Sequence, residues 1–151
     1  MRQLILMRHA QATPAQRAVD DFERALTPNG SDAAVRAAHA MAIDPGPPQL
    51  ILCSPAARTL ATAHLIQQTL QLQESAVVTD SAIYLATVTG LKRVIASTDN
   101  AITRLLFIAH NPGVSLLLAS LTRTQEPRAL ATAEFICLPL PIGEWEDLQS
   151  L

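Results

Sequence analysis

The sequence predicts a single α/β domain in which helices cover both faces of a mostly parallel sheet. Short apolar runs of strand length alternate with longer segments of helical spacing, and this alternation is typical of parallel α/β folds. The chain has 151 residues, the size of one ordinary domain, and it is 49 % hydrophobic with only 3 % aromatic residues, so aliphatic side chains must form the core. We therefore expect one three-layer α/β/α domain over residues 1–151, with five or six strands in its sheet.

The expected strands are short apolar runs that end in turns or polar residues. They lie at 3–7, 49–53, 76–79, 105–109 and 134–138, and a further edge strand is expected around 145–148. Between them, the sequence pattern predicts helices over 28–42, 55–71, 91–97 and 114–121. Thr27-Pro28 and Ser54-Pro55 each place a capping hydroxyl before a proline, which favours a helix start at these two points. The polar stretch 11–26 is expected to be a long loop that can fold over a crevice.

Cationic and titratable side chains follow three of these strands. Arg8 and His9 come at the end of the first strand, His110 follows the fourth, and Arg58 lies in the first turn of the helix after the second. Because ligand crevices lie beyond the carboxyl ends of parallel strands, we expect these four side chains to converge. The free N–H groups at the start of the second helix add to the attraction for an anion. Two imidazoles and two guanidiniums suit a phosphoryl group better than a metal ion, so the sequence predicts a phosphatase.

Composition excludes several other classes of protein. The net charge is −2 and there is no dense run of basic residues, so nucleic acid is not expected as a partner. The first apolar run is too short for a signal peptide or a membrane span, and we therefore expect a cytoplasmic protein with no membrane partner. Cys53 and Cys137 lie in apolar runs, where buried, unreactive thiols are expected. The histidines show no metal-ligand spacing, so neither a metal nor another cofactor is predicted, and His39 and His64 are expected to have packing or surface roles.

The motifs at these positions are similar to those of a known enzyme family. Members of the histidine phosphatase superfamily carry a strand followed by Arg-His-Gly, a helix start with Ser-Pro-x-x-Arg, and a later Gly-His-Asn or Ser-His pattern. The corresponding segments here are 7–10, 54–58 and 109–113. The stretch 24–30, Arg-Ala-Leu-Thr-Pro-Asn-Gly, resembles the Arg-Pro-Leu-Thr-x-x-Gly element of the short SixA-like phosphohistidine phosphatases. The resemblance covers nearly the whole chain and weakens after about Leu121.

The resemblance implies a phosphoglycerate mutase-like fold and a cofactor-independent phosphatase. It implies that neutral His9 attacks phosphorus and forms a phosphohistidine, which water then hydrolyses. Arg8, Arg58 and His110 would hold the phosphoryl oxygens, and Arg24 would be a further phosphate ligand rather than a solvated loop cation. The cations around His9 are expected to lower its pKa below the usual value of about 6.5.

Two departures from the family pattern affect the chemistry. Ala10 replaces the usual glycine, which matters only if the backbone needs a positive φ or a close phosphate approach, so we expect activity to be retained. No carboxylate stands in 83–87, after the third strand, where many phosphomonoesterases of the superfamily carry a general acid. An alkoxide leaving group needs a proton from such an acid, whereas an imidazole leaving group needs far less help, so the missing acid favours a P–N substrate. Carboxylates on the long loop are expected to be solvated, although they could swing into the site: Asp20, Asp21 and Glu23.

Three functions are consistent with these observations, in order of preference. The first is a phosphatase for protein phosphohistidine, with a role in signal transduction and a phosphorylated protein as its partner. The second is a phosphomonoesterase for a small phosphorylated substrate, and the third is an inactive module that binds phosphoproteins. The few aromatic residues disfavour a nucleotide substrate, because little is available to stack on a base. The intact set of His9, Arg8, Arg58 and His110 argues against the inactive module.

Overall fold

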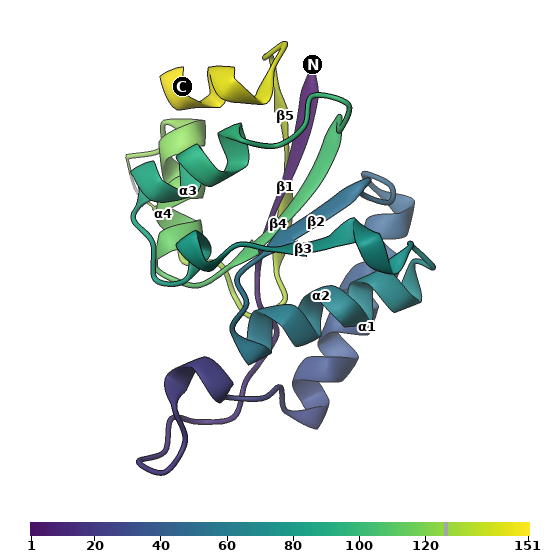
Figure 1. The fold of residues 1–151 in the computed structure, drawn as a ribbon, viewed down its shortest axis with the longest axis vertical. Coiled ribbons are helices and arrows are strands. Elements are labelled where there is room, and N and C mark those ends of the chain that lie inside the picture. Colours follow the sequence, from purple (N-terminus) through teal and green to yellow (C-terminus); the bar gives the residue numbers. More distant parts are fainter. Residues whose placement is uncertain (126) are drawn as a thin grey trace.

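A five-stranded sheet lies at the centre of the computed structural model, which describes residues 1–125 and 127–151 (Figure 1). The strands are β1 (Arg2–Arg8), β2 (Leu50–Cys53), β3 (Val77–Thr79), β4 (Arg104–Ala109) and β5 (Phe135–Leu140). The α-helices are α1 (Pro28–Ile43), α2 (Ala57–Thr69), α3 (Val88–Ala96) and α4 (Gly113–Thr122). Short 3-10 helices are η1 (Asp21–Glu23), η2 (Glu74–Ala76), η3 (Ser81–Ile83) and η4 (Trp145–Ser150). In the part of the chain that the structure describes, no helix is long and apolar enough to cross a membrane.

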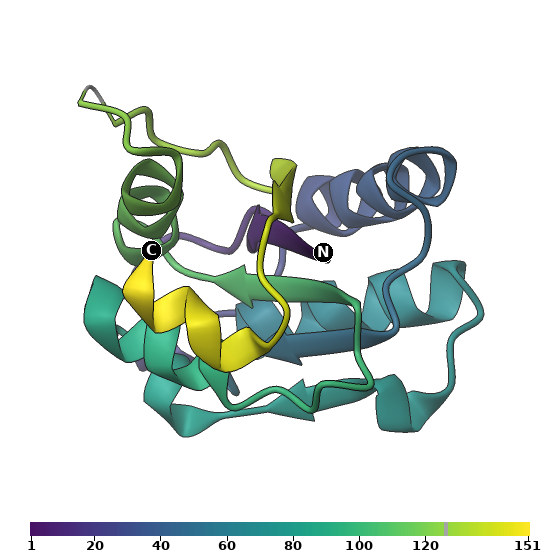
Figure 2. The ribbon, with the colours of Figure 1, turned by 90° about the horizontal axis from the view of Figure 1, so that it is seen from above.

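The strands follow the order β3-β2-β4-β1-β5, and every neighbouring pair is parallel except β1 and β5. Helices cover both faces, as the view from above shows (Figure 2). Side chains alternate along β1, so Leu4 and Leu6 pack with α3, α4 and η4 on one face. Ile5 and Met7 point to the other face and pack with α1 and α2. The predicted mostly parallel, three-layer α/β/α fold is therefore confirmed.

The register of the sheet brings the ends of β1, β2 and β4 to one edge. Arg8 of β1 pairs with Ala109 of β4, and Cys53 of β2 pairs with Ile108. The chain therefore leaves these three strands at the same level, where the predicted strand-end residues follow. The helix after β1 packs on one face and the helix after β4 on the other, so the connections that follow these two neighbouring strands diverge. In α/β folds, ligand crevices form at such a point.

The prediction of an edge strand around 145–148 is wrong, because this segment forms η4 and packs against α3. Glu144 and Asp147 form a capping box, in which each side chain accepts a hydrogen bond from the other residue's backbone N–H. The Trp145 indole is fully buried, and its Nε1 donates to the carbonyl oxygen of Ile102 at 2.7 Å. Capping and burial of the indole thus fix a helical turn where the apolar pattern alone resembled a strand.

Two helix starts also differ from the prediction. The helix α2 begins at Ala57, and the Ser54 hydroxyl accepts a hydrogen bond within the preceding turn instead of capping the helix. The helix α3 begins earlier than expected, at Val88, because the Thr87 hydroxyl accepts a hydrogen bond from the backbone N–H of Gly90 at 3.2 Å. Local capping, which the apolar spacing does not reveal, accounts for both differences.

Candidate active site

His9 and His110 stand at the carboxyl ends of the neighbouring strands β1 and β4. The backbone N–H of His9 donates to the carbonyl oxygen of Ala109 at 3.2 Å, which continues the contact between the two strands. The centroids of the two imidazole rings lie 5.6 Å apart, and the ring planes are inclined by 57°. Both histidines are buried, with exposed fractions of 7 % and 5 %. The fold therefore pairs two histidines that are far apart in the sequence.

His9 is a neutral imidazole whose Nε2 carries the free electron pair. Its Nδ1 lies 2.7 Å from the carbonyl oxygen of Ala10, and because a carbonyl oxygen only accepts, Nδ1 holds the proton. Nε2 accepts a hydrogen bond from Nε of Arg58 at 3.3 Å. Burial lowers the pKa of His9 to about 4, the Ala10 carbonyl opposes this, and the charges of Arg58 and Arg8 lower it further. The direction agrees with the sequence-based expectation, but burial contributes more than the cations do.

His110 is also neutral and has unpaired ring nitrogens. Burial lowers its pKa to about 3, with smaller contributions from the charge of Arg58 and from His9. Within residues 1–125 and 127–151, neither ring nitrogen has a hydrogen-bond partner, and the same is true of the buried Nε of Arg8. Buried polar atoms normally have partners. These three atoms at one edge of the sheet therefore indicate a ligand with hydrogen-bonding oxygens, as an oxyanion has.

The two predicted arginines reach the crevice from different elements. Arg58 lies in the first turn of α2, and only 4 % of its side chain is exposed. Arg8 ends β1, and its Nη1 donates to the carbonyl oxygen of Leu130 at 3.0 Å. The amide of Asn111 donates to the same carbonyl oxygen at 3.0 Å, so one backbone group anchors the residues that flank both histidines. Burial lowers the pKa of Arg8, yet an arginine side chain stays protonated in proteins.

Asp21 follows the alternative expectation, in which a loop carboxylate reaches the site, although its side chain stays 46 % exposed. Its carboxylate accepts hydrogen bonds from Nε of Arg24 at 3.0 Å, from Nη2 of Arg58 at 3.2 Å and from the Tyr84 hydroxyl at 2.6 Å. Its backbone carbonyl oxygen accepts from Nη1 of Arg58 at 2.7 Å. The hydrogen bond from Tyr84 lowers the pKa of Asp21 most, and the charge of Arg58 lowers it further, so the carboxylate is ionised at neutral pH. The loop 11–26 is therefore fastened to the crevice through one acidic residue.

Arg24 belongs to this cluster and is not a fully solvated cation. Its side chain is 20 % exposed, its Nη2 lies 3.0 Å from Oδ1 of Asp21, and its Nη1 donates to the carbonyl oxygen of Thr13 at 2.9 Å. Its charge is close enough to lower the pKa of both site histidines. The neighbouring carboxylates differ, because Asp20 accepts a hydrogen bond from the backbone of η1 and Glu23 is exposed.

Tyr84 is the residue at the site that the sequence prediction missed. Its ring meets the His110 ring edge-on, with centroids 5.3 Å apart, and meets Phe22 of η1 in the same way at 5.3 Å. Its hydroxyl donates to Asp21, and this hydrogen bond raises the pKa of Tyr84. The available signal was that the single tyrosine of the sequence lies in 83–87, the segment in which a carboxylate was sought.

Comparison with known proteins assigns the family. The family model of the histidine phosphatase superfamily (branch 1) matches residues 4–82, just over half of the chain. The chain belongs to the histidine phosphatase superfamily. A candidate phosphohistidine phosphatase SixA from Nakamurella multipartitia is 28 % identical, with a TM-score of 0.80 over 98 % of this chain and 89 % of that chain.

Two further solved structures are similar to this histidine phosphatase. A candidate phosphohistidine phosphatase SixA from Agrobacterium tumefaciens is 27 % identical, with a TM-score of 0.72 over 80 % of this chain and 76 % of that chain. The protein histidine phosphatase SixA complexed with tungstate is 24 % identical and has the same fold, with a TM-score of 0.80 over 91 % of this chain and 88 % of that chain. A search of curated proteins gave no match.

In this member of the superfamily, Ala10 fits where the family motif has glycine. Ala10 is fully buried, and it is not one of the residues with a positive φ. Its backbone N–H donates to the Thr62 hydroxyl at 3.0 Å, while its carbonyl oxygen faces Nδ1 of His9. The local backbone therefore has a conformation that alanine adopts without strain.

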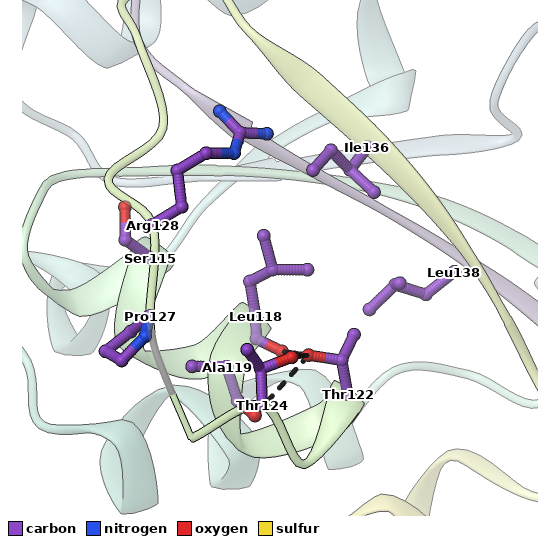
Figure 3. A pocket seen from close by; sticks show the side chains of 9 residues that line it. All are labelled: Ser115, Leu118, Ala119, Thr122, Thr124, Pro127, Arg128, Ile136 and Leu138. Carbon is purple, nitrogen blue, oxygen red and sulfur yellow. Dashed lines mark hydrogen bonds between the residues drawn. The ribbon is translucent and has the colours of Figure 1, made fainter.

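Two cavities differ in their relation to the histidines. A cavity of about 160 Å³ opens beside His110, and its lining is mostly apolar. Two of its polar lining residues already have partners in the protein, since Thr87 caps α3 and the Asn111 amide binds a backbone carbonyl, whereas the His110 ring nitrogens are unpaired within residues 1–125 and 127–151. A cavity of about 270 Å³ lies between α4 and β5, with Leu118 and Ile136 directed into it and none of the predicted site residues in its wall (Figure 3). Only the first cavity adjoins the candidate active site.

Both cysteines and the other two histidines lie outside the site. Cys53 is buried, and burial raises its pKa to about 12, which leaves an unreactive thiol. Cys137 is half-buried and free, and burial raises its pKa as well. His39 and His64 are exposed on α1 and α2. In the described part of the chain, no three His, Cys, Asp or Glu side chains gather as metal ligands would.

Proposed function

We propose that this histidine phosphatase removes the phosphoryl group from phosphohistidine on a protein, through a covalent phosphohistidine on His9. The observation that carries the proposal is a neutral imidazole nucleophile beside guanidinium groups, in a site whose carboxylate, Asp21, is held ionised. The proposed catalytic residues are His9, Arg8, Arg58 and His110, and Arg24 is a further phosphate ligand.

The first step forms the covalent intermediate. Nε2 of His9 attacks phosphorus, the bond between phosphorus and the substrate nitrogen breaks, and its electron pair returns to the substrate imidazole. Arg8 and Arg58 donate charge-assisted hydrogen bonds to the phosphoryl oxygens, and His110 donates a further one. The buried and unpaired nitrogens of Arg8 and His110 support these roles.

The second step releases phosphate. Water attacks phosphorus, the bond to Nε2 of His9 breaks, and the water proton passes to the phosphate product or to solvent. Nδ1 of His9 keeps its proton throughout and donates it in a hydrogen bond to the Ala10 carbonyl oxygen. His9 therefore departs as a neutral imidazole and needs no general acid. A substrate phosphohistidine whose other ring nitrogen carries a proton also leaves as a neutral imidazole and needs no general acid. Nucleophile and leaving group are then both imidazoles of similar basicity.

The groups near the site favour this P–N chemistry over alkyl phosphate esters. An alkoxide leaving group needs a proton from a positioned acid. The pKa of Asp21 is lowered by Tyr84 and Arg58, and the pKa of Tyr84 is raised by Asp21, so neither group donates a proton readily. Apart from His110, the cavity beside it is lined mostly by apolar side chains, which give little to the hydroxyl groups of a sugar phosphate.

One observation favours the alternative, a phosphomonoesterase for a small substrate. Asp21 lies within the cluster of Arg58 and Tyr84, so a carboxyl group is close enough to the crevice to act as a hidden acid. Rates for substrates with different leaving groups separate the two functions, because a well-placed acid flattens the dependence of the rate on leaving-group basicity.

The decisive experiment measures kcat/KM for a phosphohistidine peptide, phosphoramidate-type substrates, aryl phosphates and alkyl phosphates. We expect a clearly negative slope of log(kcat/KM) against the pKa of the leaving group, with P–N substrates and aryl phosphates far faster than alkyl phosphates. His9→Ala should abolish turnover, and Arg58→Ala should lower the rate by roughly 10² to 10⁴. A flat plot, or alkyl esters that react as fast as phosphohistidine, would replace the proposal with the phosphomonoesterase.

A further inference from the structure

We propose that the Asp21 carboxylate is a resident anion of the phosphate site, which a phosphoryl group must displace from Arg58 and Arg24. We further propose that this competition selects for substrates that make contacts beyond the phosphoryl group. The inference rests on the proposed function, because it takes both arginines as phosphoryl ligands.

The first argument is the number of donors that converge on this carboxylate. Oδ1 of Asp21 lies 3.0 Å from both Nε and Nη2 of Arg24. Oδ2 lies 3.2 Å from Nη2 of Arg58 and 2.6 Å from the Tyr84 hydroxyl. A carboxylate has about four lone-pair positions, and these donors fill them. Several N–H and O–H donors around one anion form the arrangement that a phosphoryl group also requires.

The second argument concerns the hydrogen bonds of Arg58. Its Nε donates to Nε2 of His9, while Nη1 and Nη2 donate to the backbone and the side chain of Asp21. The guanidinium therefore has the nucleophile on one side and Asp21 on the other. A phosphoryl group on Nε2 of His9 would share this guanidinium with the carboxylate, and two anions at such short range repel each other. Tight binding of the phosphoryl group thus requires the carboxylate to withdraw.

The third argument is that the carboxylate can withdraw while Arg58 stays. The Asp21 side chain is 46 % exposed and the Arg58 side chain only 4 %. The attraction between them is therefore partly screened by water. Asp21 also lies in η1 within the loop 11–26, whereas Arg58 is fixed in the first turn of α2. Movement of the loop side chain is the easier change.

The cost of displacing Asp21 is the same for every substrate, so only a substrate that makes further contacts can offset it. A phosphate with few other groups has little to offset this cost, whereas a protein substrate covers more surface. Large apolar side chains are exposed near the crevice, namely Phe22 at 37 %, Leu85 at 67 % and Leu116 at 44 %. Phe22 packs on Tyr84, and Leu116 lines the cavity beside His110. A phosphohistidine-bearing protein can bury these side chains, and a free sugar phosphate cannot.

The test is the Asp21→Asn variant, which removes the charge but keeps the backbone carbonyl that binds Arg58. Calorimetric binding of inorganic phosphate and of tungstate should become about tenfold tighter than in the wild type. The kcat/KM values for a small phosphoramidate and for a phosphohistidine protein should both rise by a similar factor, because the cost of displacing Asp21 is common to both. Tyr84→Phe removes one donor from the carboxylate and should shift both quantities in the same direction by less.

Glu23→Gln is the matched control, because it removes one negative charge from the same 3-10 helix, and within residues 1–125 and 127–151 the Glu23 carboxylate forms no ion pair with Arg24 or Arg58. It should leave the binding of phosphate and tungstate unchanged. An equal gain of affinity in Glu23→Gln would show that the effect comes from net charge alone, and it would overturn the proposal. Weaker or unchanged binding in Asp21→Asn would also overturn it, since Asp21 would then only position the arginines. If Asp21→Asn does not fold, Tyr84→Phe decides by the same measurement. Direct anion binding needs no turnover, so failure here is distinct from failure of the proposed function.

Discussion

A backbone carbonyl at Ala10 is sufficient to fix the tautomer that His9 needs in its proposed role as nucleophile. The carbonyl fixes the proton on Nδ1, burial keeps the ring neutral, and Arg58 lies at the Nε2 atom where the phosphoryl group would attach. No carboxylate partner is needed for the tautomer, because a carbonyl oxygen is an obligatory acceptor. The anionic charge near the site instead comes from Asp21, which contacts the arginines.

The lowered pKa of His9 predicts how stability changes with pH. The imidazole has a pKa of about 6.5 in the unfolded chain and about 4 in the folded protein. Between these values the unfolded chain binds a proton that the folded protein does not, so the free energy of unfolding should fall as the pH is lowered through this window. Denaturant unfolding at about pH 7, 6 and 5 measures the change. His9→Asn should lose less stability over this range, and an equal loss in both proteins would contradict the lowered pKa.

Residues at strand ends could be predicted from the sequence, whereas residues brought in by loops could not. Arg8, His9 and His110 follow apolar runs, and parallel strands have one common carboxyl edge, so the topology alone places them together. The contact of Asp21 with Tyr84 depends on the path of the loop 11–26. That path follows from tertiary contacts, which no local pattern records.

At the scale of elements, Gly30 decides how the loop 11–26 meets α1. A Cβ atom at Gly30 would lie 2.1 Å from the carbonyl oxygen of Gln11, far inside any real contact. The Thr27 hydroxyl caps α1 and also contacts Gln11, so the start of the helix is joined to the start of the loop. The Leu-Thr-x-x-Gly part of the sequence motif therefore has a structural cause, which is the close approach of two backbones.

A pair of glycine substitutions tests this role. Gly30 and Gly90 occupy the same position after a capping threonine, but a Cβ at Gly90 would meet its nearest atom at 3.4 Å, an ordinary contact. Gly30→Ala should destabilise the protein by about 1–3 kcal/mol, the usual cost of overpacking. Gly90→Ala should be neutral or stabilise by up to about 1 kcal/mol, because alanine favours the helix. Chemical denaturation gives the free energy of unfolding of each variant. Similar changes in both would show that the close approach of Gln11 does not determine the need for glycine at position 30.

Most elements could be predicted because apolar runs and helical spacing reflect the two faces of one sheet. The exceptions are decided by side-chain hydrogen bonds, as in the cap formed by Thr87 and in the capping box of Glu144 and Asp147. The sequence pattern also could not predict that β5 runs antiparallel to β1, because the alternation of apolar residues is the same for both strand directions.

At the scale of the whole molecule, the site is assembled from segments spread over most of the chain. Residues after β1, β2, β3 and β4 supply it, the loop 11–26 contacts it through Asp21, and the backbone of Leu130 anchors Arg8. Ordering of the site therefore depends on the central sheet and on helices from both faces. We propose that residues 1–151 fold as one unit for this reason.

This proposal predicts one cooperative unfolding transition that shifts as a whole when an oxyanion binds. Tungstate that binds only the folded protein, at a concentration of 100 times its Kd, should stabilise it by about 2.7 kcal/mol. Because the residues that bind the oxyanion follow several strands, every probe of unfolding should report the same shift. One such probe is the fluorescence of Trp145, which is buried and lies outside the site. Arg58→Ala should lose most of the shift while it keeps a single transition. Circular dichroism and tryptophan fluorescence measured on the same samples would contradict the proposal if their transitions separated, or if tungstate moved only one of them.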